Sequence, residues 1–183
     1  MNNSDVKFFI EVFVTLFVIM DPPGTIPLFL SLTSGRTHRL RKRAAWQAVT
    51  VAFFVITVCA LFGQSILDYL GITLAAMQGS GGLLLLLVAL VPLGTPLLAG
   101  PGAIVATIVF VRAVNDTAMA IALALGIVAV HIVLWLFLRF SIVIIRVIKD
   151  SGVTLITRIA GLLLSAIAVQ LIANSVTAFV KNA

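Results

Sequence analysis

The chain consists of long apolar stretches separated by short polar or glycine- and proline-containing segments, and this pattern predicts a bundle of membrane-spanning helices. A helix of about 20 apolar residues crosses the hydrocarbon core of a bilayer. We therefore expect an all-α membrane protein with six transmembrane helices, in a single domain that covers residues 1–183. The expected helical ranges are about 6–33, 44–67, 71–91, 102–114, 117–140 and 155–180.

An acidic residue and a helix-breaking sequence interrupt the first of these stretches. Asp21 is followed by Pro22, Pro23 and Gly24, and the residues on both sides are mostly apolar. A carboxylate at bilayer depth costs about 2.5–3.5 kcal/mol on insertion scales, and proline ends a helix because it lacks the backbone donor. Free backbone groups at that depth are tolerated only where they are buried in protein or line a cavity. The combination indicates a transport site.

Proline and glycine also precede the fourth helix, which we therefore expect to be broken like the first. The predicted helix breaks are at Pro22, Pro23, Pro27, Pro92, Pro96 and Pro101. Unpaired N–H groups at the start of each resumed half-helix would suit an anionic group such as a carboxylate. These groups belong to Gly24, Thr25, Gly102 and Ala103, and similar backbone is offered by Gly94, Thr95 and Gly100. Helix kinking without ligand binding is the alternative.

Asp21 has two interpretations that are compatible with each other. Asp at the N-cap with Pro at the next position is a favoured helix start, so Asp21 is expected to cap the half-helix that begins at Pro22. A cap inside the membrane still places a carboxylate at the helix break, where it would bind a substrate ammonium or carry a coupling proton.

Three further polar residues within the expected helices are candidates for the site. His131 would carry a proton, unless it is simply hydrogen-bonded to a neighbour. Gln170 and Asn174 are four residues apart and share one face of the last helix, where they would either contact substrate or hold helices together.

The sequence also repeats weakly. Pro23-Gly24 is followed 78 positions later by Pro101-Gly102, and leucine-rich matches recur at a similar offset. With three spans in each half, the halves 6–91 and 92–180 would be antiparallel. We therefore expect an inverted 3+3 repeat whose two helix breaks meet near the bilayer midplane.

Composition and charge support a membrane protein and set its orientation. The chain is 62% hydrophobic and 10% charged, whereas a soluble domain carries roughly 25% charged residues. The net charge of +6 does not indicate nucleic-acid binding, because no basic stripe is interleaved with aromatic residues. Nine of the twelve Lys and Arg residues fall on one side of a six-helix topology, so we expect that side to be cytoplasmic and both termini outside. We expect 141–149 to continue the fifth helix along the membrane interface.

Signatures of enzymes and of metal sites are absent from the sequence. There is no Walker loop, dinucleotide fingerprint, HExxH or GxSxG motif. Cys59 is the single cysteine, which excludes an internal disulfide, and two histidines with one cysteine make no convincing metal site. We expect no enzymatic activity, no cofactor and no metal.

Two motifs resemble those of a known family. The run from Asp21 to Thr33 resembles the first signature of the MarC/SnatA family, a DPxGxxPxFxxLT-like sequence, and the run from Pro92 to Ile104 resembles its second, PLxxPLxAGPGAI. The run from Gly161 to Gln170 resembles the final helix. The resemblance implies a six-helix inner-membrane protein of the LysE-type transporter superfamily, in which some members move glycine and alanine. By motif, its site residues would be Asp21, Pro22, Gly24, Thr25, Pro27, Pro92, Gly94, Pro96, Gly100, Pro101 and Gly102.

The chain departs from the family pattern where a hydrophilic segment usually precedes the second motif. Here the apolar run from Leu83 to Leu90 leads straight into Val91-Pro92. Because a sharp turn at that place would bury unpaired backbone groups near lipid, we expect a loop to be missing from the sequence at this junction.

The first functional hypothesis is a secondary transporter of small neutral amino acids in the inner membrane, with proton or cation coupling left open. A second is an exporter or flippase of a lipid-linked or drug-like solute. A third is a membrane assembly protein without transport activity. The expected partners are the amino acid and the bilayer, and a homo-oligomer is compatible with the sequence.

Overall fold

The computed structural model describes residues 3–90 and 98–182, and almost all of them are helical. The helices are α1 (Asn3–Met20), α2 (Pro22–Leu32), α3 (His38–Tyr69), α4 (Leu74–Leu90), α5 (Pro101–Ala113), α6 (Thr117–Arg139) and α7 (Ser141–Asn182). The all-helical fold is thus confirmed for the described residues. The breaks expected at Pro92 and Pro96, the backbone of Gly94 and Thr95, and the junction at Val91 lie outside them.

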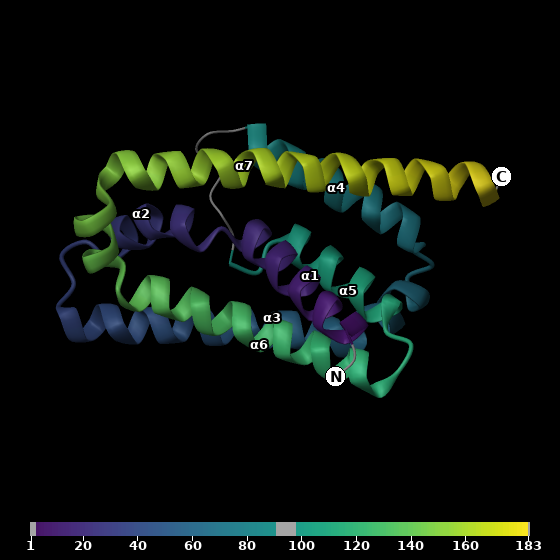
Figure 1. The fold of residues 1–183 in the computed structure, drawn as a ribbon, viewed down its shortest axis with the longest axis horizontal. Coiled ribbons are helices and arrows are strands. Elements are labelled where there is room, and N and C mark those ends of the chain that lie inside the picture. The colour runs from purple at the N-terminus through teal and green to yellow at the C-terminus, as the bar shows by residue number, and fades with distance from the viewer. Residues whose placement is uncertain (1–2, 91–97, 183) are drawn as a thin grey trace.

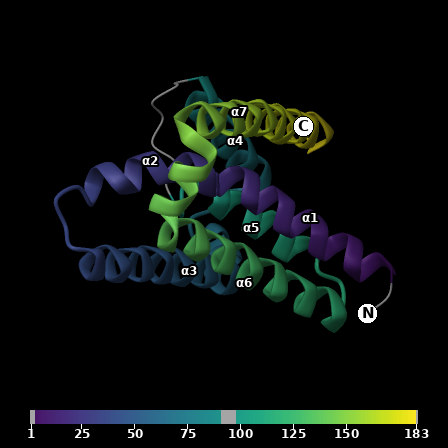
Figure 2. The ribbon, with the colours of Figure 1, turned by 60° about the vertical axis from the view of Figure 1, so that its left-hand side comes forward.

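The helices form two outer pairs with a central layer between them (Figure 1). α4 packs along α7 on one side, and α3 packs along α6 on the other. α1 and α5 lie between these pairs, as the rotated view in Figure 2 also shows. The first turns of α1 and the last turns of α7 lie at the same end of the bundle, opposite the connection between α2 and α3.

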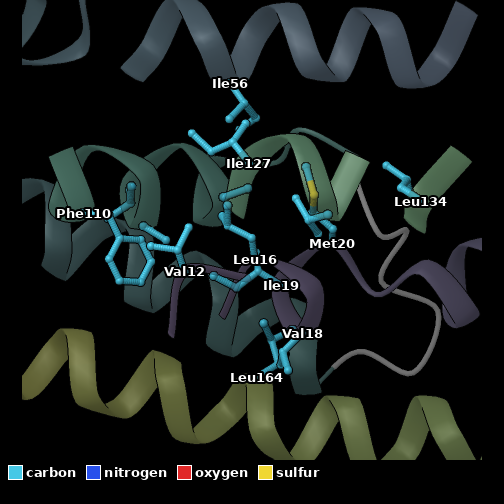
Figure 3. Packing of buried hydrophobic residues seen from close by; sticks show 14 of the residues in the cluster. Val12, Leu16, Val18, Ile19, Met20, Ile56, Phe110, Ile127, Leu134 and Leu164 are labelled. Atoms are coloured by element: carbon cyan, nitrogen blue, oxygen red, sulfur yellow. The ribbon is translucent and has the colours of Figure 1, made fainter. Parts of the chain in front are cut away.

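The second half of α1 is buried on two opposite faces, one towards α6 and the other towards α7. Leu16 and Met20 are fully buried, and in Figure 3 they lie on the side of α6. Val18 points the other way and meets Leu164 of α7. A helix that is apolar all round belongs in the interior of a bundle, so the end of α1 and the helix break that follows it lie inside the protein.

Small residues allow α4 and α7 to approach closely. A Cβ on Gly82 would come within 2.7 Å of the backbone oxygen of Ala168, and one on Gly79 within 2.6 Å of Ser175 Oγ. The buried Ser175 hydroxyl donates to the carbonyl oxygen of Ala75 over 2.7 Å. Small residues and interhelical hydrogen bonds of this kind stabilise helix pairs in lipid, where the hydrophobic effect does not.

Four helical segments of the described residues are long and apolar enough to cross a membrane. They are Asn3–Leu32, which combines α1 and α2, His38–Tyr69, Thr117–Arg139 and Ser151–Lys181. Leu74–Ala89 and Pro101–Ala113 are apolar but shorter. α5 begins at Pro101, one of the positions at which the sequence predicts a helix break.

Three of the boundaries that differ from the sequence-based prediction have a clear local cause. α3 begins six residues earlier than expected, at His38, because Thr37 caps it by accepting a hydrogen bond from the Leu40 N–H. α4 begins three residues later than expected because Gly71, with φ of +67°, belongs to the preceding turn. The segment 141–149 does not continue α6, which ends at Arg139; it forms the first part of α7 and is set off from the rest by a non-helical Lys149 (φ 60°, ψ 167°).

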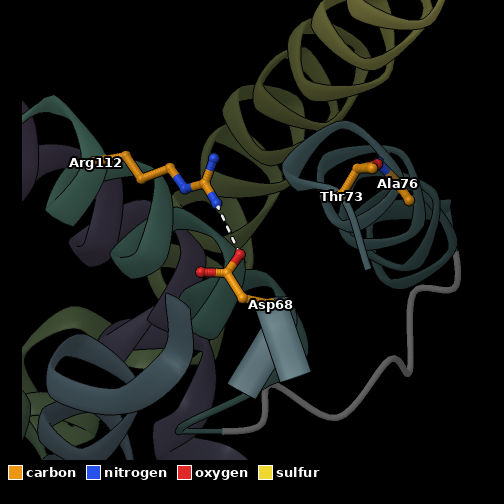
Figure 4. Close-up of polar contacts among 4 residues, drawn as sticks. All are labelled: Asp68, Thr73, Ala76 and Arg112. Carbon is orange, nitrogen blue, oxygen red and sulfur yellow. Dashed lines mark hydrogen bonds and ion pairs between the residues drawn. The ribbon is translucent and has the colours of Figure 1, made fainter. Parts of the chain in front are cut away.

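The ends of α3 and α5 lie together at one end of the bundle. Arg112 Nη2 lies 3.8 Å from Asp68 Oδ1, and both side chains are partly exposed (Figure 4). Beside them, Thr73 caps α4 by accepting a hydrogen bond from the Ala76 N–H over 3.1 Å. The six-helix topology puts these loops on one side of the membrane, and the ion pair agrees with that expectation. An exposed pair contributes at most about 1 kcal/mol to stability.

Candidate functional site

The helix break between α1 and α2 consists of a single residue. Asp21 has left-handed backbone angles (φ 40°, ψ 67°), which Asp and Asn adopt more readily than most residues. Its N–H donates to the Phe17 carbonyl over 3.0 Å and completes α1. Its carbonyl accepts from the Thr25 N–H over 3.0 Å and starts α2. The break predicted at Pro22 is therefore confirmed, and the half-buried Asp21 is its only non-helical residue.

The carboxylate of Asp21 caps α2. Its Oδ1 accepts a hydrogen bond from the Gly24 N–H over 3.1 Å. Thr25 Oγ1 donates to the Asp21 carbonyl over 2.9 Å, and a second contact joins it to the Met20 carbonyl over 3.3 Å. Because proline has no N–H, no free donor remains in the first turn of α2. The expectation of unpaired N–H groups at Gly24 and Thr25 was wrong, since the cap occupies the position that a substrate carboxylate would take.

The groups that can still bind a ligand at this break are hydrogen-bond acceptors. Asp21 Oδ2 has no hydrogen-bond partner among the described residues. Pro27 lies inside α2 rather than at a break, so that prediction was wrong, because the helix continues to Leu32 without the N–H of residue 27. The missing donor leaves the Pro23 carbonyl without its usual partner four residues on. Such a site favours a cationic group or a proton.

The start of α5 differs from that of α2. Gly100 is at the N-cap and Pro101 at the first position, and no described side chain caps this helix. The Ala103 N–H donates to the Gly100 carbonyl over 3.0 Å, so the expectation that this N–H is unpaired was wrong. The Gly102 N–H has no partner among the described residues. A Cβ on Gly102 would overlap the side chain of Leu85, so a larger residue here would displace this leucine of α4.

The two helix starts lie in the same part of the bundle. Both views show the beginning of α5 beside the junction of α1 and α2 (Figures 1 and 2). Met20, directly before the break, and Ala103, in the first turn of α5, belong to one buried cluster and are both fully buried.

The structure does not link His131 to Asp21 by a hydrogen bond or ion pair. His131 Nδ1–H donates to the Ile127 carbonyl over 2.7 Å, and Nε2 is buried with no hydrogen-bond partner among the described residues. The ring meets Phe53 of α3 edge-on, at 5.2 Å between centroids. The intrahelical bond is the alternative that the sequence left open for this histidine.

Gln170 and Asn174 share a face of α7, as their spacing predicts. Gln170 Nε2 donates to Asn174 Oδ1 over 2.8 Å, and both side chains are exposed. Among the described residues they form no hydrogen bond to another helix, and they do not line the two cavities described below.

Sequence reasoning missed a cavity of about 280 Å³ between α3 and α6. Trp46 and Trp135 line it and pack edge-to-face at 6.3 Å between centroids. The signal was present in the sequence, because Trp46 and Phe53 lie on one face of α3 and Trp135 lies four residues after His131 on α6.

Comparison of the sequence with known proteins identifies one family. A model of the MarC family of integral membrane proteins matches residues 6–90 and 88–180. A UPF0056 membrane protein of Methanocaldococcus jannaschii is 34% identical over 205 aligned positions, which cover 94% of this chain and 97% of that protein. A UPF0056 membrane protein of Archaeoglobus fulgidus is 31% identical over 193 positions, with 91% of each chain covered. The UPF0056 membrane protein YhcE of Escherichia coli is 27% identical, with 94% and 93% covered.

The alignments also bear on the junction at residues 88–91. Both archaeal alignments are longer than the 183 residues of this chain, so these relatives have residues that it lacks. The two stretches matched by the family model meet at 88–90, where the sequence predicts a missing loop. No solved structure matches the chain significantly. Matched over nearly its whole length, the chain belongs to the MarC family and is a multi-pass integral membrane protein.

Proposed function

We propose that the protein is a secondary transporter of small neutral amino acids across the inner membrane, with Asp21 at the centre of its site. The observation that carries this proposal is a carboxylate at the one non-helical residue of a 30-residue apolar span, with one oxygen unpaired among the described residues. An ionisable group inside a membrane span is costly and is retained where it serves a substrate or ion pathway.

The chemistry of the two helix starts fits a zwitterion. The acceptors at the α2 start, Asp21 Oδ2 and the Pro23 carbonyl, would receive the ammonium group or a coupling proton. The Gly102 N–H at the α5 start, which has no partner among the described residues, would receive the carboxylate, because helix N-termini favour anions. This assignment places the two charges of the substrate at different helices, which keeps its carboxylate away from Asp21.

The packing supports an inverted repeat as the transport device. The offset between Pro23-Gly24 and Pro101-Gly102 pairs α2 with α5. Exchanging the halves would map the α2–α6 contact onto the α5–α3 contact and the α2–α7 contact onto the α5–α4 contact, and all four contacts exist. The α3–α6 and α4–α7 pairs map onto themselves. α2 is about 17 Å long and α5 about 20 Å, at 1.5 Å per residue, so each break would lie about half a bilayer from its own end of the bundle. Both termini would face outward, with the basic α2–α3 end in the cytoplasm.

Uptake of radiolabelled alanine and glycine into proteoliposomes, with and without a pH gradient, tests the proposal. Saturable uptake above that of protein-free vesicles would support it, and dependence on the gradient would identify the proton as the coupling ion. Absence of uptake and of counterflow in both orientations, with correctly folded protein, would contradict it.

A further inference from the structure

The cavity between α3 and α6 is an apolar groove that runs along both helices. Its lining recurs at helical spacing on each: Trp46, Val49, Thr50 and Phe53 on α3, and Val128, His131, Ile132 and Trp135 on α6. Residues three and four apart share a helix face, so each set forms one wall. Trp46 and Phe53 are exposed in the isolated chain. From Trp46 to Phe53 the groove extends about 10 Å along α3.

A second cavity, of about 180 Å³, is basic and lies at the end of the bundle where α3 begins and α6 ends. Its lining residues are His38, Arg41, Lys42, Arg139, Phe140, Ser141, Ile142 and Val143. Lys42 precedes Trp46 by four residues, and Arg139 follows Trp135 by four. One helical turn, about 5.4 Å, therefore separates the groove from the basic cavity on both helices.

The cationic groups of this cavity are not neutralised within the described part of the chain. Arg41 donates to the hydroxyl and carbonyl oxygens of Thr33, and Arg139 lies over the Phe140 ring at 5.1 Å. Neither these arginines nor Lys42 forms an ion pair with a described carboxylate. Asp68, at the far end of α3, pairs with Arg112 instead.

We propose that an anionic phospholipid binds here, with its phosphate in the basic cavity and one acyl chain in the groove. The basic cavity lies at the end of the bundle and the apolar groove lies deeper along the same helices. The phosphate and the acyl chain of a phospholipid follow each other in the same order along the membrane normal. Basic pockets between transmembrane helices bind anionic head groups, and the groove supplies the apolar surface that free phosphate would not use. Since Arg41 holds the last turn of α2 through Thr33, the lipid would touch the half-helix that starts at Asp21.

The two tryptophans make this proposal directly measurable, because they are the only ones in the chain and both line the groove. The full chain is reconstituted in phosphatidylcholine vesicles that contain a small fraction of either brominated phosphatidylglycerol or brominated phosphatidylcholine, whose acyl bromines quench tryptophan on contact. We expect stronger quenching by the brominated phosphatidylglycerol at equal mole fraction. The relative affinity derived from it should fall about tenfold in Lys42→Gln/Arg139→Gln, which removes two cationic contacts.

Arg36→Gln/Arg146→Gln is the matched control, since it removes two exposed charges from the same end without touching either cavity. It should keep the preference for the anionic lipid. In the unmutated chain, raising the salt from about 50 to 500 mM should weaken the preference, and this measurement does not depend on the folding of any variant. Equal quenching by both lipids would overturn the proposal. A preference for the anionic lipid that is lost only in the control variant would also overturn it. The proposal would likewise fail if inorganic phosphate abolished the preference, so that brominated phosphatidylcholine quenched the tryptophans as strongly as the anionic lipid.

Discussion

The carboxylate of Asp21 occupies the space that a side chain at position 24 would need. Its Oδ1 accepts from the Gly24 N–H over 3.1 Å, and a Cβ built on Gly24 would overlap Oδ2. Gly24 is helical, so its role is not backbone freedom but room for the cap. The sequence Asp-Pro-Pro-Gly therefore works as a unit, in which proline removes two donors, Asp satisfies the third and Gly makes that contact sterically possible.

Gly24→Ala is expected to displace the Asp21 carboxylate and lose the cap. An N-cap substitution lowers the free energy of unfolding by about 0.5–2 kcal/mol. The decrease should lie at the upper end of this range here, because the freed N–H is inside the bundle. Gly161→Ala is the matched control, since nothing lies within 4 Å of a Cβ at that position in α7. Thermal unfolding in detergent should show a lower midpoint for Gly24→Ala and an unchanged or higher one for Gly161→Ala. Equal midpoints would refute the steric argument.

The α4–α7 contact predicts a second pair of effects. Gly82→Ala should be destabilising, because the neighbour of the new Cβ is the Ala168 backbone oxygen, which cannot rotate away. Ser175→Ala should cost about 0.6–1.7 kcal/mol, the range for one interhelical hydrogen bond in a membrane protein. Unfolding midpoints of both variants against Gly161→Ala measure this. A Gly82→Ala protein as stable as the parent would mean that α4 and α7 are not so closely packed.

The proposed topology predicts which loops react with a membrane-impermeant thiol reagent. Cys59 is the single cysteine, so Cys59→Ala gives a background without thiols. Asn115→Cys, in the exposed turn before α6, should be labelled in intact cells. Ser34→Cys, in the exposed turn after α2, should be labelled only after permeabilisation. The reverse pattern would invert the orientation, although the fold itself would stand.

The first helix break could be predicted from its residue types, but whether the N–H groups at the start of α2 have hydrogen-bond partners could not. Asp21 and Pro22 identify the cap and the first helical position from residue type alone. Whether the Gly24 N–H is free depends on the rotamer of Asp21, which only the folded chain fixes. Pro27 looked like a break because proline disrupts helices, yet α2 continues through it to Leu32.

Tertiary packing sets what residue type and spacing leave open. The i, i+4 spacing correctly placed Gln170 and Asn174 on one face, but it does not say which face packs against α4; the interior face carries Ser175 instead. The paired tryptophans Trp46 and Trp135 come from helices far apart in sequence, so the groove they form required the pairing of α3 with α6.

Transport by this protein requires the charge of Asp21, and not only its cap, if the proposed function is correct. Asn caps helices about as well as Asp and also tolerates left-handed backbone angles, so Asp21→Asn should keep the fold and remove the charge. Asp21→Ala should lose both, and its lower unfolding midpoint separates the two roles.

The most direct measurement is uptake of radiolabelled alanine by Asp21→Asn in proteoliposomes, over a range of pH and beside the unmutated protein at equal reconstitution. We expect a folded protein with an unfolding midpoint near that of the parent and uptake reduced at least about tenfold, the factor that about 1.4 kcal/mol of lost interaction produces. Full uptake by Asp21→Asn at every pH tested would contradict it and would leave Asp21 as a structural cap.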